Sequence, residues 1–135
     1  MSNYRKLKTR YTSRVHLRAA LKAAGIKFEE CKPGVEKTLF GYMGDERAET
    51  ATFIVRRSEI TASSNDIGWT WDGMQFQEIV SEYDQTLFKC TDIRKSIRRE
   101  YAYAATVSQM STKGYMTQRV DLDSGEIQIN VTGRI

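Results

Sequence analysis

The sequence is poor in the residues that build metal sites and covalent cross-links. Only two of the 135 residues are cysteines, Cys31 and Cys90, and His16 is the single histidine. A structural zinc site needs four such ligands at short spacings, so we predict no bound metal, and no motif indicates a cofactor. We expect the cysteines to be free thiols rather than a disulfide, because the chain has the features of a protein from a reducing compartment.

Long apolar runs are absent as well. No run of about 18 apolar residues could cross a bilayer, and the start from Met1 to Lys6 is followed by no secretory-type hydrophobic segment. We therefore expect a cytosolic protein, or one from an equivalent reducing compartment, with no membrane contact. With one proline, 40% hydrophobic and 28% charged residues, the composition is typical of a single domain over residues 1–135.

The motifs of common enzyme classes are missing too. Gly41 and Gly44 lie in a loop that lacks both the P-loop lysine and the spacing of a dinucleotide-binding loop. No GxSxG sequence is present, and His16 has no carboxylate partner near it in the sequence. These patterns predict no catalytic residue.

Positive charge is concentrated at the N-terminus. Met1 to Phe28 contains eight basic residues and no acidic one, whereas the chain from Glu29 onward contains 13 basic and 17 acidic residues. The overall net charge of +4 therefore conceals a local basic field. The residues that we predict to contact an acidic partner or nucleic acid are Lys6, Lys8, Arg10, Arg14, Arg18 and Lys22.

Periodicity predicts how this charge is displayed. Residues 4–11 alternate between apolar and basic positions, which indicates a half-buried strand. A helix follows, with Thr12 or Ser13 as its N-cap and Gly25 at its end. If strand and helix pack as neighbours, their basic residues form one surface. The apolar stripe of this helix consists of Leu17, Ala20, Leu21 and Ala24.

The rest of the chain reads mostly as strands joined by short turns, apart from one long helix. We therefore predict an α+β fold: a largely antiparallel sheet of about six to eight strands with two helices packed on one face. The order of the strands does not follow from the sequence. The expected strands are 26–31, 35–42, 49–57, 66–71, 74–80, 115–122 and 126–132, and the long helix is 85–112.

The segment from Ser64 to Gly73 combines both tryptophans with two aspartates and an asparagine. In a regular strand Asp66 and Asp72 would be roughly 20 Å apart, too far for a pair of glycosidase carboxylates. The favoured interpretation makes Asn65 and Asp66 bond their own local backbone and Asp72-Gly73 a hairpin turn. Trp69 and Trp71 would then be aromatic residues of the core or its rim; the alternative places them on an exposed strand as a stacking platform.

A weaker candidate is a small-molecule or enzymatic pocket around the loop from Gly41 to Asp45. Tyr42, Asp45, Arg47 and Asp66 carry the polar groups that could line it. No spacing among them matches a known site, and a simple turn explains the loop more economically.

Several motifs nevertheless point to a family. They are Lys8-Thr9, Gly41-Tyr42-Met43-Gly44-Asp45, Asn65-Asp66-Ile67-Gly68-Trp69, Trp71-Asp72-Gly73, Arg99-Glu100-Tyr101-Ala102, Lys113-Gly114-Tyr115 and Val131-Thr132-Gly133-Arg134. With them the chain resembles the family called hypothetical chloroplast reading frame thirty-five, whose members are encoded in algal plastids, cyanobacteria, other bacteria and some phages. This is a domain of unknown function, so the resemblance implies a cytosolic or stromal setting and no reaction. Family members often begin Ser-His-Phe where this chain has Ser2-Asn3-Tyr4, so no role of an N-terminal histidine carries over.

Two functions from different classes follow. The first is a non-enzymatic adaptor that contacts a protein partner through the aromatic hairpin and the basic strand and helix. The second is a nucleic-acid-binding protein that uses the same basic residues on phosphates, with Tyr4, Tyr11 or the tryptophans stacking on bases. Exposed strand edges also make a homodimer plausible.

Overall fold

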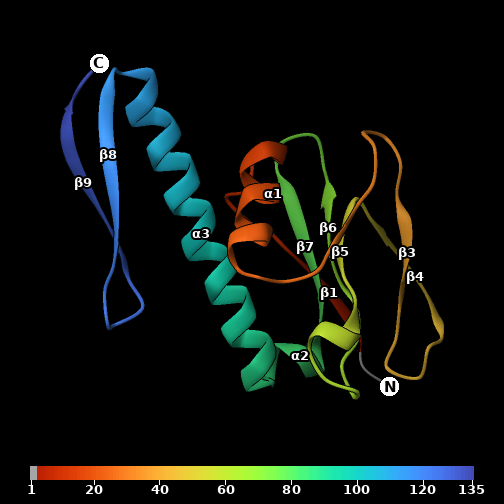
Figure 1. Ribbon diagram of the computed structural model, residues 1–135. Helices are drawn as coiled ribbons and strands as arrows, with labels where there is room; N and C mark the ends of the chain where they lie inside the picture. The colour runs from red at the N-terminus through yellow and green to blue at the C-terminus, as the bar shows by residue number, and fades with distance from the viewer. Residues whose placement is uncertain (1–2) are drawn as a thin grey trace.

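A five-stranded antiparallel sheet forms the centre of the computed structural model, which describes residues 3–135 (Figure 1). Ser2 of the N-terminal Ser2-Asn3-Tyr4 sequence therefore lies outside the described residues. The first strand pairs with a strand from the middle of the chain, so the sheet is built from distant segments. Across the sheet the strands are β1 (Tyr4–Leu7), β7 (Phe76–Ser81), β6 (Ile67–Trp71), β5 (Phe53–Val55) and β2 (Glu29–Glu30).

Two helices, α1 (Arg14–Ala23) and α3 (Phe88–Thr112), cover one face of this sheet (Figure 1). The short helix α2 (Glu82–Thr86) leads from β7 into α3, and a 3-10 turn, η1 (Arg57–Glu59), follows β5. The apolar stripes of α1 and α3 meet the sheet in one buried core, as their 3.6-residue spacing requires. Fully buried members of this core include Leu17, Leu21, Phe53, Val55, Ile67, Trp69, Val80, Cys90 and Ile97.

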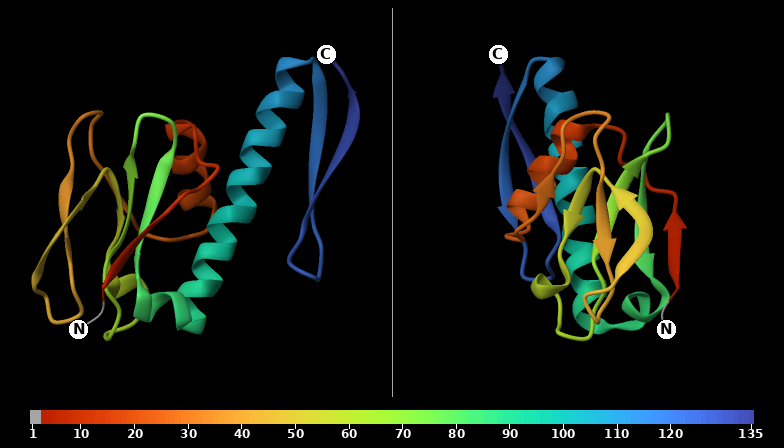
Figure 2. Two further views of the ribbon diagram at one scale, coloured as in Figure 1. Left: turned by 180° about the vertical axis from the view of Figure 1, so that it is seen from behind. Right: turned by 90° about the vertical axis from the view of Figure 1, so that its right-hand side faces the viewer.

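A two-stranded hairpin, β3 (Lys37–Phe40) and β4 (Glu46–Ala51), covers the opposite face (Figure 2, right). Gly68 on β6 permits this packing, since a Cβ there would lie 2.5 Å from the Ala51 Cβ and 3.1 Å from a Leu39 methyl group. The sheet is thus buried on both faces. The second core cluster consists of Leu39, Ala51, Ile54 and Ile79.

The chain ends in a hairpin, β8 (Tyr115–Asp121) and β9 (Ile127–Arg134), which lies on the side of α3 that faces away from the sheet (Figures 1 and 2). Arg119 on β8 donates two hydrogen bonds of 2.7 Å to the Glu100 carboxylate on α3, and its guanidinium lies 4.6 Å from the Tyr103 ring centroid. No side chain from residue 102 to residue 135 is fully buried. The hairpin is therefore attached to α3 by an ion pair and a single layer of contacts.

The α+β prediction is confirmed, including the antiparallel pairing and the two helices on one face. The predicted strands divide among the central sheet and two separate hairpins. The strand expected over 49–57 is interrupted at Thr52, whose backbone bonds to Trp69 and Cys31, and the chain passes there from β4 to β5. Ala51 consequently belongs to the second core cluster, whereas Phe53 belongs to the first.

Other boundaries also differ from those expected. The strand over 4–11 ends at Leu7, and the strand over 26–31 is reduced to Glu29–Glu30. The long helix begins at Phe88, because extended backbone at Leu87 separates it from α2.

Candidate anion-binding cleft

Thr9 fixes the chain that follows β1 against the start of β7. Its hydroxyl donates to the Phe76 carbonyl and accepts the amide of Tyr11 at 3.0 Å, while the Phe76 amide donates to the Tyr11 carbonyl at 2.7 Å. The side chains after Leu7 therefore continue to alternate as they do in β1, although residues 8–11 are not part of the strand. Tyr11 faces the core, and Lys8 and Arg10 are exposed.

Helix α3 supplies the other side of a cleft. Arg94 and Arg98 lie four residues apart and so project from the same helix face. Arg94 holds Glu78 of β7 through two bonds, 3.2 Å from Nε to Oε1 and 2.9 Å from Nη2 to Oε2, and their side chains are 13% and 9% exposed. The cleft has a volume of about 480 Å³ and is lined by Leu7, Lys8, Thr9, Arg10, Tyr11, Glu78, Arg94 and Arg98.

The charges in this cleft are unbalanced. Glu78 is the one carboxylate among its lining residues, and Arg94 already neutralises it. Lys8, Arg10 and Arg98 form no ion pair with any residue in the range 3–135 that the structure describes. Three cations from two elements thus converge on one hollow, an arrangement that favours a phosphate or another anion.

Two groups of the cleft, Tyr11 and Arg94, have shifted pKa values. Burial, assisted by the nearby Glu78 carboxylate, raises the pKa of Tyr11, although Arg98 and Arg94 act in the opposite direction. Burial also disfavours the charge of Arg94, but its bonds to Glu78 outweigh this effect and the pKa of Arg94 is raised. The cleft therefore contains a neutral Tyr11 together with a charged Arg94.

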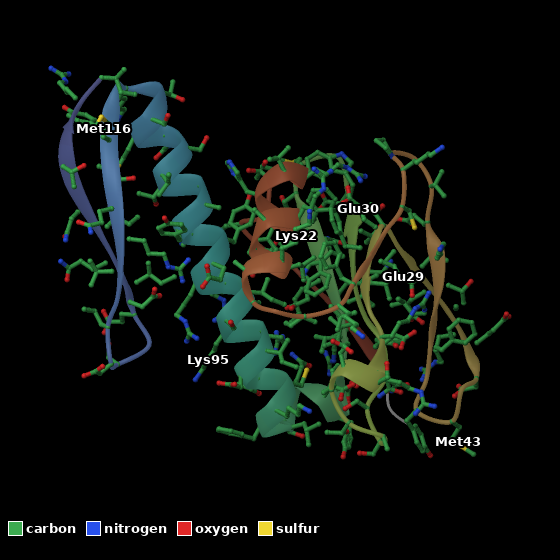
Figure 3. All side chains as sticks on the ribbon, in the orientation of Figure 1. Lys22, Glu29, Glu30, Met43, Lys95 and Met116 are labelled. Carbon is green, nitrogen blue, oxygen red and sulfur yellow. The ribbon has the colours of Figure 1, made fainter. Side chains whose placement is uncertain are left out.

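The predicted basic residues separate into two groups. Arg14 and Arg18 both bind Glu30 on β2, with N–O distances of 2.8 Å from Arg14 and of 2.6 and 2.7 Å from Arg18. Because β1 and β2 are the opposite edges of the sheet, Arg14 and Arg18 do not join the basic residues that follow β1 in one surface. Lys6 is exposed on β1 beside the cleft segment, and Lys22 is exposed in the last turn of α1 (Figure 3).

The two tryptophans also separate. Trp69 is completely buried in the core and cannot form a platform. Trp71 is 47% exposed, and its ring lies edge to face with Phe76 at a centroid distance of 5.0 Å. Trp71 borders a pocket of about 280 Å³, called here the aromatic pocket, which is lined by Thr12, Arg14, Pro33, Gly34, Thr52, Trp71 and Phe76.

The four residues of the candidate pocket do not line one cavity. Tyr42 is 41% exposed, the Asp45 carboxylate packs against Gly41, and the Arg47 guanidinium lies 5.1 Å from the Tyr4 ring centroid. Asp66 is only 1% exposed. It borders a different cavity, of about 570 Å³, with Phe40, Gly44, Arg56, Arg57, Ser58 and Ala62.

Asp66 is a hydrogen-bonding centre within the fold. Its carboxylate accepts bonds of 2.8 Å from the amide of Phe40, the amide of Arg57 and the Arg56 guanidinium. Its carbonyl accepts the Tyr4 hydroxyl at 2.7 Å. The interpretation that Asp66 bonds its own local backbone is therefore wrong, because its partners come from three other segments.

Asn65 is a second hydrogen-bonding centre, and it connects another set of elements. Its side-chain amide donates to Ser81 at 2.9 Å and to Asp84 at 3.2 Å, and its Oδ1 accepts the amide of Tyr42 at 3.0 Å. Asp84 and Ser81 are completely buried at the start of α2. Asn65 and Asp66 together connect β1, α2, the end of β3 and the turn after β5, which makes them structural residues.

The part of the chain from residue 3 to its end offers no metal site and no membrane span. No group of three or more His, Cys, Asp or Glu side chains there is placed to hold a metal ion. None of its helices combines the length and apolarity required to span a bilayer. Cys31 and Cys90 are free and buried.

Arg94 and Arg98 are the site residues that sequence reasoning missed. The four-residue spacing of Arg94 and Arg98 indicates a basic face on the long helix. The alternation of Lys8 and Arg10 likewise indicates a basic face on the first strand. Only the order of the strands, which places β1 beside β7 and hence beside Glu78, brings the two faces together.

Comparison with known families assigns the chain to one of them. The model of a family described as "Protein of unknown function (DUF1257)" matches residues 20–129, so the chain belongs to this family. The matched range includes Trp71, Arg94 and Arg98, and the segment that carries Lys8 and Arg10 precedes it. No curated protein and no solved structure matches the chain significantly.

Proposed function

We propose that this member of the family is a non-enzymatic binding protein that holds nucleic acid by its phosphates in the cleft between residues 7–11 and α3. The observation that carries the proposal is the convergence of Lys8, Arg10 and Arg98, none of them paired with a carboxylate among residues 3–135. Clustered cations that lack carboxylate partners are the electrostatic footprint of phosphate recognition.

Both walls of the cleft are tied to β7. Thr9 ties one wall to β7, and the buried pair of Arg94 and Glu78 ties the other wall to the same strand. A site whose walls are held before the ligand arrives loses less conformational entropy on binding. Lys95 extends from α3 on the side facing away from the sheet (Figure 3) and adds to the positive field without lining the cleft.

Two adjacent arginines provide a matched test. Arg98 lines the cleft, whereas Arg99 lines a separate cavity between α3 and the terminal hairpin. Arg98→Gln and Arg99→Gln change the net charge equally and on the same helix. In fluorescence anisotropy with a labelled oligonucleotide at about 50 mM salt, Arg98→Gln should lower the binding affinity roughly 5- to 10-fold. Arg99→Gln should lower it less than about 2-fold.

Two results would contradict the proposal. The first is an absence of binding by the wild-type protein at this salt concentration. The second is an equal loss in both variants, because it would mean that overall charge, and not the cleft, attracts the nucleic acid.

A second function, that of an adaptor for a protein partner, is favoured by the hairpin of β8 and β9. This two-stranded sheet has open backbone edges, and its outer residues Met116 and Val131 are 48% and 52% exposed. Open edges and exposed apolar side chains permit strand addition by another chain, including a second copy of this one.

This adaptor proposal predicts a defined partner. A tagged protein should retain it from a host lysate after nuclease treatment, and Val131→Lys should abolish the retention, while the control Lys113→Gln should not. Recovery of the protein alone after mild crosslinking, together with a monomeric mass in sedimentation, would contradict it.

The cellular setting is part of the same proposal. The resemblance to hypothetical chloroplast reading frame thirty-five supports a cytoplasmic or plastid stromal location, or the host cytoplasm for a phage-encoded copy. Two buried free cysteines are consistent with a reducing compartment.

A further inference from the structure

The aromatic pocket beside Trp71 is built from groups that suit a flat ring. Trp71 and Phe76 supply the aromatic surface, and Pro33 and Gly34 also line the pocket and add no polar side chains. Arg14 forms part of the rim and is held there by the Glu30 carboxylate and the Cys31 carbonyl, both at 2.8 Å. A ring that entered this pocket would meet fixed walls and two polar edge groups, from Arg14 and Thr12.

The pocket and the cationic cleft share one piece of backbone. Tyr11 lines the cleft and the next residue, Thr12, lines the pocket, so their Cα atoms are about 3.8 Å apart. Phe76, in the pocket, receives the hydroxyl bond of Thr9 and donates its amide to Tyr11. Backbone bonds to Gln75 and Met74 lower the pKa of Asp72, and the Lys8 charge adds to this effect, which places Lys8 near the turn beside Trp71.

We infer that the bound nucleic acid is single-stranded, with its phosphates in the cationic cleft and one unpaired base against Trp71 in the aromatic pocket. The inference rests on the proposed function. A duplex keeps its bases stacked inside and has no ring to offer the pocket, whereas a single strand can turn a base outward. The positive charge immediately next to the pocket selects a base that carries a phosphate over an apolar side chain of a protein.

Trp71 also reports on its own occupancy. The chain contains two tryptophans, and the other one, Trp69, is completely buried. Titration with an unlabelled single-stranded oligonucleotide should quench tryptophan fluorescence, and the quenching should disappear in Trp71→Phe. The matching duplex should produce little quenching.

Affinity measurements complete the test. Trp71→Ala should weaken binding of a labelled single strand by about 5- to 100-fold, and Trp71→Phe, which keeps a ring, should recover most of it. Weak duplex binding should be the same in Trp71→Ala as in the wild type. Met74→Ala is the control, because Met74 is 77% exposed in the same hairpin turn and lines neither the cleft nor the pocket.

The outcomes separate the inference from the function on which it rests. Equal affinity for single strand and duplex, without quenching and without an effect of Trp71→Ala, would overturn the inference and leave the phosphate-binding cleft intact. An absence of binding to either nucleic acid would overturn both. Quenching by an aromatic peptide but by no oligonucleotide would overturn the inference in favour of a protein ligand.

Discussion

Replacing Asp66 by asparagine should destabilise the protein far more than its conservative chemistry suggests. The Asp66 carboxylate is buried and accepts from three donors, with Oδ2 bound to the Phe40 amide and the Arg56 guanidinium and Oδ1 bound to the Arg57 amide. Asparagine has the same shape but only one acceptor oxygen. In either orientation its amide group points a donor at a donor.

The magnitude follows from the groups left without a partner. The milder orientation keeps the bonds to Phe40 and Arg56 and leaves the Arg57 amide unpaired, which costs about 1–3 kcal/mol. Arg56 also exchanges a charged acceptor for a neutral one, a loss of about 1 kcal/mol, although Glu29 still pairs with it. The expected decrease in the free energy of unfolding is therefore about 2–4 kcal/mol.

Urea unfolding followed by circular dichroism measures this decrease. The midpoint of Asp66→Asn should fall by about 1–2 M relative to the wild type. Asp92→Asn is the matched control, since Asp92 is exposed on α3 and should change stability by less than about 0.5 kcal/mol.

Equal midpoints for Asp66→Asn and Asp92→Asn would refute the structural role assigned to Asp66. A variant of normal stability that no longer binds nucleic acid would move Asp66 from the scaffold to the ligand site.

Three further predictions concern stability and reactivity. Gly68→Ala should destabilise by about 1–3 kcal/mol in thermal or urea unfolding, because its Cβ would collide with that of Ala51, and adding Ala51→Gly should restore part of the loss; independent, additive effects would argue against this contact. Hydrogen bonds from Arg18 hold the pKa of Glu30 below its ordinary value of 4.5, so the stability that this ion pair contributes is present above pH 4.5 and is lost as the pH falls through the folded pKa. Arg18→Gln should therefore lower the free energy of unfolding at pH 7, and its difference from the wild type should shrink as the pH falls below 4.5; a pH-independent difference would contradict this. Burial, with help from a nearby carboxylate, raises the pKa of Cys90 to about 12, so a thiol reagent should label it only after unfolding, and rapid labelling of the folded protein would show that the site opens.

Local features of the fold could be predicted from the sequence because they depend on neighbouring residues. Ser13 caps α1 by accepting the amide of His16 at 3.2 Å, and Gly25 follows the helix with a φ of 72°. The Asp72 carboxylate accepts the amides of Met74 and Gln75 in the predicted turn. Each of these interactions spans only a few positions, so composition and spacing were sufficient to identify them.

Interactions between distant segments could not be predicted. Arg14 and Arg18 were expected to contact an external partner, but Glu30 on the far edge of the sheet binds both. That pairing depends on strand order, which a hydrophobic pattern does not encode. The bonds that Asp66 and Asn65 make depend on it in the same way, and so does the position of Arg98 in the cleft.

The salt dependence of binding tests the central claim most directly. If Lys8, Arg10 and Arg98 each neutralise one phosphate of a single strand, the logarithm of the association constant should fall with the logarithm of salt concentration with a slope of about −2. Arg98→Gln should reduce the magnitude of this slope by about 0.7, and Arg99→Gln should leave it unchanged. An affinity that does not vary with salt, or an identical slope in Arg98→Gln and the wild type, would contradict a phosphate-binding cleft.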